Sequence, residues 1–413
     1  MFAKPFLGQL GRGHVDGVYN FAKDPNALER FASGSGDGVV KVWDLTSKDE
    51  VWQTKAHENI VKGVCFTLDK KLLTCGGVDK TIAVHDPYNT ASGSKPVSTY
   101  QGKNAFTGIS HHRESAAFAA SHSAGISIYD LSRPTSAPIS NLAWPTSIDT
   151  VSTVCFNHVE TSILASAATD RSIALYDLRT NSPLRRIILQ HASNAISWNP
   201  MEAFNFAVAN EDHNIYIFDS RMLGSSSQSS AGQKAVAPRA LNVLKDHVAA
   251  VMDVSFSPTG ENLVSASYDR TIRLWSRNKG HSDDIYHTKR MQRVFCSTYT
   301  PDAQYVLSGS DDGNIRLWRA KASSRQGVVS ARQRQALEYA DALKERYKHM
   351  PEVKRIARHR HLPKTIKKAG EIKREELDSI KRREENRRKH EKKTVGGSGR
   401  KSEREKMVIT TEI

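Results

Sequence analysis

Cysteine is rare in this chain, and its few copies are spread too widely to suggest a site. The four cysteines, Cys65, Cys75, Cys155 and Cys296, include no C-x-x-C pair. Because structural zinc sites and disulfide frameworks depend on recognisable cysteine spacings, the sequence favours neither. Cys65 and Cys155 occupy matching places in two related stretches, V-K-G-V-C-F and V-S-T-V-C-F, which is typical of small buried side chains. We therefore expect reduced thiols within a protein core.

Long hydrophobic runs are also missing. Hydrophobic residues make up 38% of the chain, below the ~45–50% of an average globular sequence, so part of the chain should lie outside a packed core. No apolar run approaches the ~18 residues of a membrane-spanning helix, and no N-terminal signal peptide is visible. These absences predict a soluble protein of a reducing compartment, with no membrane partner.

The motifs of common enzyme sites are absent as well. The chain has no G-x-x-x-x-G-K-[ST] phosphate-binding loop and no nucleophile with a recognisably placed base. The pairs His111-His112 and His359-x-His361 lack a cysteine or carboxylate cluster at metal-ligand spacing. The sequence therefore predicts no catalysis, no metal or cofactor site, and no small-molecule substrate.

What the chain does contain is a repeat, represented by the stretch 263–275 (L-V-S-A-S-Y-D-R-T-I-R-L-W). Two short apolar runs flank a turn with an aspartate, which is typical of half-buried strands. The closing position of the unit recurs at residues 43, 85, 129, 176, 218, 275 and 318, with spacings of 42–47 residues and a single gap of 57. A period in the low forties that ends in W-D predicts an all-β fold, a seven-bladed WD40 β-propeller with four antiparallel strands in each blade.

One aspartate marks the turn of nearly every unit, and a serine, Ser123, replaces it in the third. We expect these carboxylates to shape turns, because a propeller spreads them around a ring where they form no common site. The turn aspartates are Asp37, Asp79, Asp170, Asp212, Asp269 and Asp312. A histidine precedes four of them by 21–23 residues. These histidines are His14, His57, His191 and His247. Such pairs commonly meet in a hydrogen-bonded network in WD repeats.

The ring must close, because an open sheet edge invites aggregation. The last unit ends at Trp318 without an outer strand, and the apolar stretch 4–10 precedes the first repeat. We predict that residues 4–10 supply the outer strand of the seventh blade. The propeller then spans residues 1–319, with a flexible Ser/Gly-rich insert at 223–239 that explains the long gap.

Beyond residue 319 the chain becomes strongly basic. From Arg319 to Ile413 there are 29 Lys and Arg against 14 Asp and Glu, whereas the preceding part has 31 against 30. Apolar spacing predicts a helix over 328–350, a short second helix after Pro351, and a charged helix over 364–393. The final M-V-I-T-T is consistent with a strand or a partner-docking segment. Residues 320–413 thus form a basic helical extension.

Lines of cations suit a polyphosphate, because each neutralised phosphate releases counterions. We therefore predict RNA or ribonucleoprotein contacts by the extension and by the basic loop 286–294, since loops on rigid scaffolds often carry function. The predicted contact residues are Lys289, Arg290, Arg293, Lys354, Arg355, Arg358, Arg360, Lys364, Lys367, Lys368, Lys381, Arg382, Arg383, Arg387, Arg388 and Lys389. Aromatic residues are nearly absent after Tyr347, so contacts to the RNA backbone are expected. A nuclear import signal and a solvated charged helix are the alternatives.

Five stretches distinguish this sequence from WD-repeat proteins in general. They are F-A-K-P-F-L (2–7), G-H-V-D-G-V-Y (13–19), Y-H-T-K-R-M-Q (286–292), G-N-I-R-L-W-R-A-K-A-S (313–323) and K-R-I-A-R-H-R-H-L-P-K (354–364). With them the chain resembles the suppressor-of-fibrillarin family of WD-repeat proteins. The resemblance implies a nucleolar component of the small-subunit processome, which contains a box C/D guide ribonucleoprotein. It implies a scaffolding role in maturation of small-subunit (18S-type) ribosomal RNA.

Some members of that family are also described as substrate receptors of cullin-4 ubiquitin ligases. The resemblance places the ligase-adaptor box, of W-D-x-R type, at Asp177 with Arg179 and at Asp219 with Arg221, although the tryptophan is missing from both. A third interpretation is a general histone- or peptide-binding propeller with its ligand at the mouth of the central channel. It leaves the basic extension unexplained.

Overall fold

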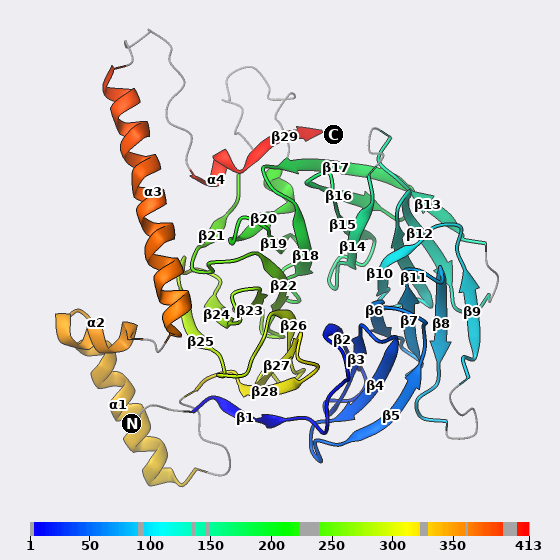
Figure 1. Ribbon diagram of the computed structural model, residues 1–413, viewed down its shortest axis with the longest axis horizontal. Coiled ribbons are helices and arrows are strands. Elements are labelled where there is room, and N and C mark those ends of the chain that lie inside the picture. Colours follow the sequence, from blue (N-terminus) through cyan, green and yellow to red (C-terminus); the bar gives the residue numbers. More distant parts are fainter. Residues whose placement is uncertain are drawn as a thin grey trace.

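The computed structural model describes residues 4–89, 95–133, 137–145, 149–223, 239–322, 329–359, 362–390 and 403–412. Seven antiparallel sheets surround a central axis, so the predicted seven-bladed β-propeller is confirmed (Figure 1). The first strand of each repeat lies innermost and the fourth outermost, which is the arrangement expected when sequence neighbours pair. Most of the insert predicted at 223–239 lies outside the described residues.

The strands follow the repeats in order. Blade 1 contains β2 (Val18–Lys23), β3 (Arg30–Ser35), β4 (Val39–Asp44) and β5 (Glu50–Lys55). Blade 2 contains β6 (Val61–Phe66), β7 (Leu72–Gly76), β8 (Thr81–His85) and β9 (Ser98–Gln101). Blade 3 contains β10 (Phe106–His111), β11 (Ala117–His122), β12 (Gly125–Asp130) and β13 (Ser140–Leu142). Blade 4 contains β14 (Val151–Phe156), β15 (Ile163–Ala168), β16 (Ser172–Asp177) and β17 (Ser182–Leu189).

Blade 5 contains β18 (Ser193–Trp198), β19 (Asn205–Asn210), β20 (Ile215–Asp219), the short 3₁₀ helix η2 (Ser220–Leu223) and β21 (Asn242–Leu244). Blade 6 contains β22 (Val251–Phe256), β23 (Asn262–Ser267), β24 (Ile272–Ser276) and β25 (Ser282–Tyr286). Blade 7 contains β26 (Val294–Tyr299), β27 (Tyr305–Ser310), β28 (Ile315–Arg319) and β1 (Phe6–Gln9).

Blade 7 joins the two ends of the ring. Strand β1 pairs antiparallel with β28, with Phe6 opposite Trp318. Next to it the Leu10 amide donates to the Ile315 carbonyl at 3.0 Å, and the Leu10 side chain is 1% exposed. The prediction that residues 4–10 close the seventh blade is therefore confirmed.

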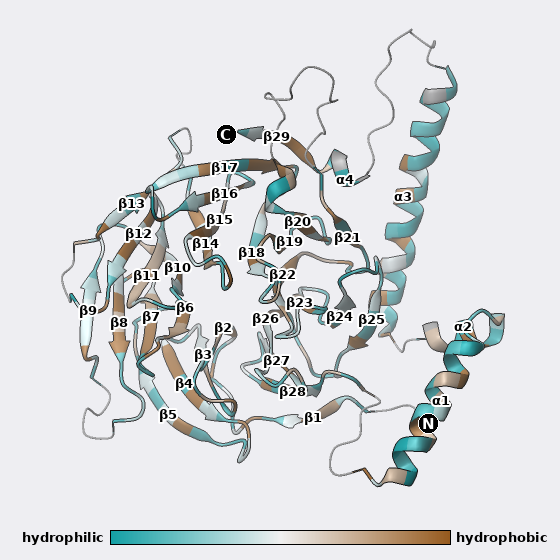
Figure 2. Cartoon of the chain, turned by 180° about the vertical axis from the view of Figure 1, so that it is seen from behind, coloured by the Kyte–Doolittle hydropathy of each residue, from teal (hydrophilic) through white to brown (hydrophobic). Residues whose placement is uncertain are grey.

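Tryptophans at the closing position lie in the core between blades. Trp43, Trp275 and Trp318 are each almost completely buried, and Figure 2 shows apolar strands across the ring. Each indole Nε1 donates to a serine hydroxyl on the neighbouring strand at 2.8 Å. Because a buried N–H without a partner is costly, this repeated bond explains why tryptophan fits the position.

The expected histidine–aspartate pair forms in two of the four repeats. His57 Nδ1 lies 2.6 Å from Asp79, and His247 Nδ1 lies 2.8 Å from Asp269. The expectation was wrong for the other two pairs among the described residues. His14 bonds Ser33 through Nε2, while its Nδ1 has no partner and does not reach Asp37. In the remaining repeat Asp212 accepts a bond from the Tyr216 hydroxyl, whereas the carbonyl of His191 accepts from the Asn210 side chain.

The extension is largely helical, as the sequence predicts. Its helices are α1 (Ala331–Arg346), α2 (Pro351–Arg358), α3 (Lys364–His390) and the short α4 (Glu403–Lys406). The Ser330 hydroxyl caps the start of α1, and Pro351 occupies the first turn of α2, where it needs no N–H. Among the described residues no helix is long and apolar enough to cross a membrane.

The chain ends in strand β29 (Val408–Glu412), which adds a fifth strand to blade 4 by pairing antiparallel with β17. The M-V-I-T-T stretch is thus a strand, and the blade on which it docks belongs to the same chain. In Figure 1 the extension runs along blade 7, blade 6 and blade 5 before β29 reaches blade 4.

Candidate RNA and protein interface

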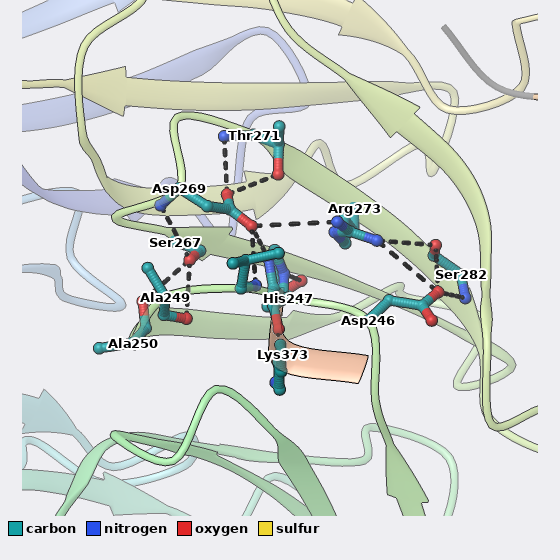
Figure 3. Close-up of polar contacts among 12 residues, drawn as sticks. Asp246, His247, Ala249, Ala250, Ser267, Asp269, Thr271, Arg273, Ser282 and Lys373 are labelled. Carbon is teal, nitrogen blue, oxygen red and sulfur yellow. Dashed lines mark hydrogen bonds and ion pairs between the residues drawn. The ribbon is translucent and has the colours of Figure 1, made fainter. Parts of the chain in front are cut away.

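Helix α3 is fixed to the propeller through one lysine. Lys373 Nζ donates to the backbone carbonyl of His247 at 2.8 Å, in the loop between β21 and β22 (Figure 3). Burial lowers the pKa of Lys373, and the nearby carboxylate of Asp212 opposes that shift. Two turns N-terminal to this contact, Ile366 is buried at 7% exposure. An ammonium and an apolar side chain therefore hold the first half of α3 in place.

The carbonyl that receives Lys373 belongs to the most complete repeat network. His247 Nδ1 contacts Asp269, and its Nε2 contacts the Ser265 hydroxyl at 2.7 Å. Burial alone would raise the pKa of Asp269, but His247 and the Arg273 guanidinium hold it well below its usual range. Because both ring nitrogens of His247 are hydrogen-bonded, the residue is held in place and its backbone carbonyl is a rigid acceptor for Lys373.

The last strand is fixed by a second polar cluster. Arg186 on β17 lies between Asp170, which it contacts, and Glu412 on β29 at 3.1 Å. The Trp144 indole also donates to Glu412, at 3.0 Å. Asp170 therefore has two roles. It shapes its turn by accepting a hydrogen bond from the Ser172 amide, and through Arg186 it helps to link blade 4 to the C-terminal strand. Val408 covers the same edge of β17 with a 6% exposed side chain.

These anchors leave most of α3 as an exposed basic rod. Its 27 residues extend over about 40 Å, and Figure 2 shows it mostly hydrophilic. The predicted contact residues with exposed side chains in the extension are Lys354, Arg355, Lys364, Lys367, Lys368, Lys381, Arg382, Arg383, Arg387 and Lys389. Arg360 lies outside the described residues, as do the side chains of Arg358 and Arg388. A line of cations of this length suits the spacing of a nucleic-acid backbone.

The basic loop at 286–294 lies on the propeller. Met291 and Val294 are buried and fix the loop, whereas Lys289, Arg290 and Arg293 are exposed. The Arg293 guanidinium lies over the ring of Tyr268 at 5.4 Å from its centre. The loop therefore presents three cations on a rigid base, and one of them is already oriented by an aromatic ring.

The two W-D-x-R-type boxes adopt the same turn. In each, the aspartate accepts the arginine's backbone amide at 2.9 Å. The guanidinium of Arg179 lies 3.5 Å from Asp177, and that of Arg221 lies 2.8 Å from Asp219. Both arginine side chains are largely exposed, at 76% and 63%. Arg221 also stacks on Phe204, so Arg179 is the one more readily available to a partner.

The remaining turn aspartates accept hydrogen bonds from residues of their own turns. Asp37 accepts from the Val39 amide, and Asp212 accepts from the Asn214 amide. Asp312 contacts Arg316 and accepts from the Asn314 amide. Among the described residues no cluster of three or more His, Cys, Asp or Glu side chains could hold a metal ion.

Comparison with known proteins divides the chain where β28 ends. A model described as "Sof1-like domain" matches residues 320–408, and one described as "WD domain, G-beta repeat" matches 6–44, 48–86, 239–276 and 279–319. Protein SOF1 of Saccharomyces cerevisiae is 48% identical, over 100% of this chain and 84% of its own length. The chain belongs to the Sof1 family. This confirms the resemblance that the sequence motifs indicated.

Other relatives of this Sof1-family chain carry two kinds of name. Protein sof1 of Schizosaccharomyces pombe is 51% identical, over 99% of this chain and 88% of its own length. The "DDB1- and CUL4-associated factor 13" of Xenopus laevis is 44% identical, over 99% of this chain and 87% of its own length. Both matches cover propeller and extension together.

Sequence reasoning missed the residues that attach the Sof1-like extension. Lys373, Arg186 and Trp144 carry no motif, and their partners lie 126, 226 and 268 residues away along the chain. The available signal was indirect. Lys373 stands on the same helix face as Ile366, one of the few apolar residues of α3, seven residues earlier.

Proposed function

We propose that this Sof1-family chain is a non-catalytic scaffold in ribosome biogenesis, acting in the nucleolus as a component of the small-subunit processome. The propeller binds processome proteins and the box C/D guide ribonucleoprotein, and the basic extension binds the pre-ribosomal RNA. Maturation of the small-subunit (18S-type) ribosomal RNA is the process that it serves.

The observation that carries this proposal is the exposed cationic rod of α3 held on a rigid ring. A helix free in solution would lose conformational entropy on binding, whereas α3 is already oriented by Lys373 and Ile366. Helix α3 carries no Phe, Tyr or Trp side chain on which a base could stack. Its exposed cations therefore favour contacts with the RNA phosphates. Membership of the Sof1 family supports ribosomal RNA as the partner in this proposal.

The test combines crosslinking with charge reversal. Ultraviolet crosslinking with peptide mapping should find pre-ribosomal RNA on residues 354–390. The triple variant Arg382→Glu, Arg383→Glu, Arg387→Glu should reduce crosslinking strongly. The fall of the log binding constant with log salt should also become less steep by about 2–3, because three phosphate contacts are lost.

A matched variant controls for net charge. Lys55, Lys95 and Lys103 are exposed lysines of the propeller, and their reversal to glutamate changes the net charge equally. RNA binding should be nearly retained in this variant. Equal loss in both variants, or crosslinks confined to the propeller, would contradict the proposed role of the extension.

A second candidate function is that of substrate receptor for a cullin-4 ubiquitin ligase. It is favoured by the two exposed box arginines and by the names of the vertebrate relatives. The double variant Arg179→Ala, Arg221→Ala should then lose capture of the ligase adaptor subunit. Arg133→Ala is the control, because Arg133 follows Asp130 by three residues where the box arginines follow by two. Unchanged capture in the double variant would exclude this function.

A further inference from the structure

A groove separates the helices of the extension from the propeller. It lies between α1, α2 and the first half of α3 on one side and the outer part of blade 6 on the other, with a volume of ≈ 1990 Å³. A helix about 10 Å across and three turns long fills roughly 1300 Å³. The groove therefore has room for one helical segment of another molecule.

The helical wall of the groove is basic. It carries seven lysine and arginine side chains against Glu345 and Glu371. Lys344, which pairs with Asp341 at 2.8 Å, lies near the end of α1, and Lys348 follows that helix. Lys354 comes from α2 and Lys367 from α3. Such an excess of cations attracts an anionic partner.

The propeller wall, in contrast, is electrically balanced by its own ion pairs. Lys279 lies 2.6 Å from Asp283, and Asp246 lies 3.7 Å from Arg273. Asp246 also lies at hydrogen-bond distance, 2.9 Å, from His281 Nδ1. Because these carboxylates are already paired, they do not compensate the charge of the opposite wall. The field inside the groove is set by the helices.

Apolar side chains from both walls line the groove. Ile366 and Val353 come from the helices, and Val248 and Ile285 come from blade 6. Leu377 extends the strip along α3 and is 47% exposed, although a leucine on a solvated helix gains nothing from that position. Among the described residues no Phe, Tyr or Trp side chain lines the groove, whose only rings are the imidazoles of its histidines.

These features select one kind of occupant. RNA would find cations but no Phe, Tyr or Trp ring for base stacking, and it would leave the apolar strip in water. The chain's own segment 391–402 holds four Lys and Arg against one Glu, so the basic wall repels it. A helix with carboxylates on one face and apolar residues on the other satisfies both the charge and the apolar strip.

We propose that this groove binds an acidic amphipathic helix of a partner protein. Its apolar face packs on Val353, Ile366 and Leu377. Its carboxylates face Lys348, Lys354 and Lys367. Binding would hold α1 and α2 against blade 6, where α1 now buries no residue of its own. Lys354 and Lys367 are shared with the RNA contacts proposed above, but Arg382, Arg383 and Arg387, which carry the RNA test, do not line the groove.

A synthetic peptide of about 14 residues tests the groove directly in the full-length protein. Its leucines recur at i, i+3, i+4 and i+7 and its other positions are mainly glutamate. Fluorescence anisotropy should show binding at least about tenfold tighter than that of a scrambled peptide or of one with lysine in place of glutamate. Equal binding of the scrambled peptide would overturn the proposal.

Two substitutions on the same helix provide a matched pair. Leu377→Asp lies in the groove and should weaken peptide binding at least about tenfold, because a charge meets the apolar face. Ile372→Asp is also exposed on α3 but does not line the groove, and it should change binding less than about twofold. Equal effects of both variants would refute the site.

The natural occupant can be identified by photo-crosslinking. A photoreactive residue in place of His349, which lines the groove, should label an acidic amphipathic segment of another protein in native particles. Labelling of RNA, of a second copy or of segment 391–402 would overturn the proposal. RNA crosslinking of Leu377→Asp should stay at the wild-type level, so failure of the groove and failure of the RNA contacts are distinguishable.

Discussion

His85 is a histidine at the closing position of blade 2, where a tryptophan or another aromatic residue stands in the other blades. It fills the closing position that tryptophan takes in blades 1, 6 and 7, is 1% exposed, and neither ring nitrogen has a hydrogen-bond partner. Burial lowers the pKa of His85 to about 4. Between pH 6.5 and about 4, His85 is protonated in the unfolded chain but stays neutral in the folded protein. The free energy of unfolding therefore decreases as the pH falls through this range.

His85→Phe should remove this weakness. We expect the variant to be more stable by about 1 kcal/mol at pH 7, because two unsatisfied polar atoms disappear. The difference should widen by roughly 1–2 kcal/mol at pH 5, because the variant has no proton to bind. Urea unfolding at both pH values measures it. Tyr129→Phe, at the same position in blade 3, should leave the pH dependence unchanged; identical pH slopes for His85→Phe and wild type would contradict the account.

Two turn aspartates separate the contribution of the network from that of the turn. Asp269 contacts His247 and Thr271 in a buried cluster, whereas Asp37 accepts the Val39 amide and does not reach its histidine. Asp269→Ala should cost about 3–5 kcal/mol, because it leaves buried polar partners unpaired. Asp37→Ala should cost only about 1 kcal/mol. Denaturant unfolding compares them, and equal costs would show that the turn alone matters.

The same comparison shows how far single residues can be predicted. The sequence places His14 and His247 at nearly equal distances from their aspartates, so it predicts the same pair in both repeats. In blade 1, however, the His14 ring bonds Ser33 and leaves Nδ1 unpaired. Side-chain rotation decides between these arrangements, and spacing carries no information about it.

At the scale of elements, helices and strands were predictable where their signals are local. The apolar spacing of α1, Pro351 at the start of α2 and the alternation of the blade strands all lie within a few residues of the element that they specify. Strand β29 was left open because Val408–Glu412 becomes a strand only through β17, more than 200 residues earlier. A single edge strand has no local signal that names its partner.

Val408→Asp tests how strongly β29 is held. Val408 is 6% exposed against blade 4, whereas its neighbour Ile409 is 52% exposed. A carboxylate in place of Val408 should release the strand, and amide exchange in Ser182–Gln190 should then rise at least about tenfold, because edge hydrogen bonds are lost. Hydrogen-exchange mass spectrometry measures this. Ile409→Asp should leave exchange unchanged; if it has the same effect, burial of Val408 does not hold the strand.

At the scale of the whole molecule, the ring was predictable because its signal is repeated seven times and each blade pairs mainly with itself. The course of the extension was not, because it depends on contacts between distant blades and the last helix. Net charge identified the extension as basic but could not tell which of its cations face the propeller. Lys373 is half-buried against blade 6, while Lys381 remains exposed on the same helix.

The two terminal strands offer a test of ring closure. Both β1 and β29 lie at the outer edge of a blade, but β1 joins the first repeat to the last, and Leu10 beside it packs with Trp43. Leu10→Ala should cost about 2–5 kcal/mol. Deletion of residues 1–10 should cost more, and it should cause self-association because the β28 edge is exposed. Deletion of residues 403–413 removes an added strand and leaves the ring closed. This deletion should therefore lower the melting temperature less than deletion of residues 1–10 does. Thermal melting with light scattering distinguishes them, and equal losses in both deletions would show that closure by β1 contributes nothing beyond one strand pairing.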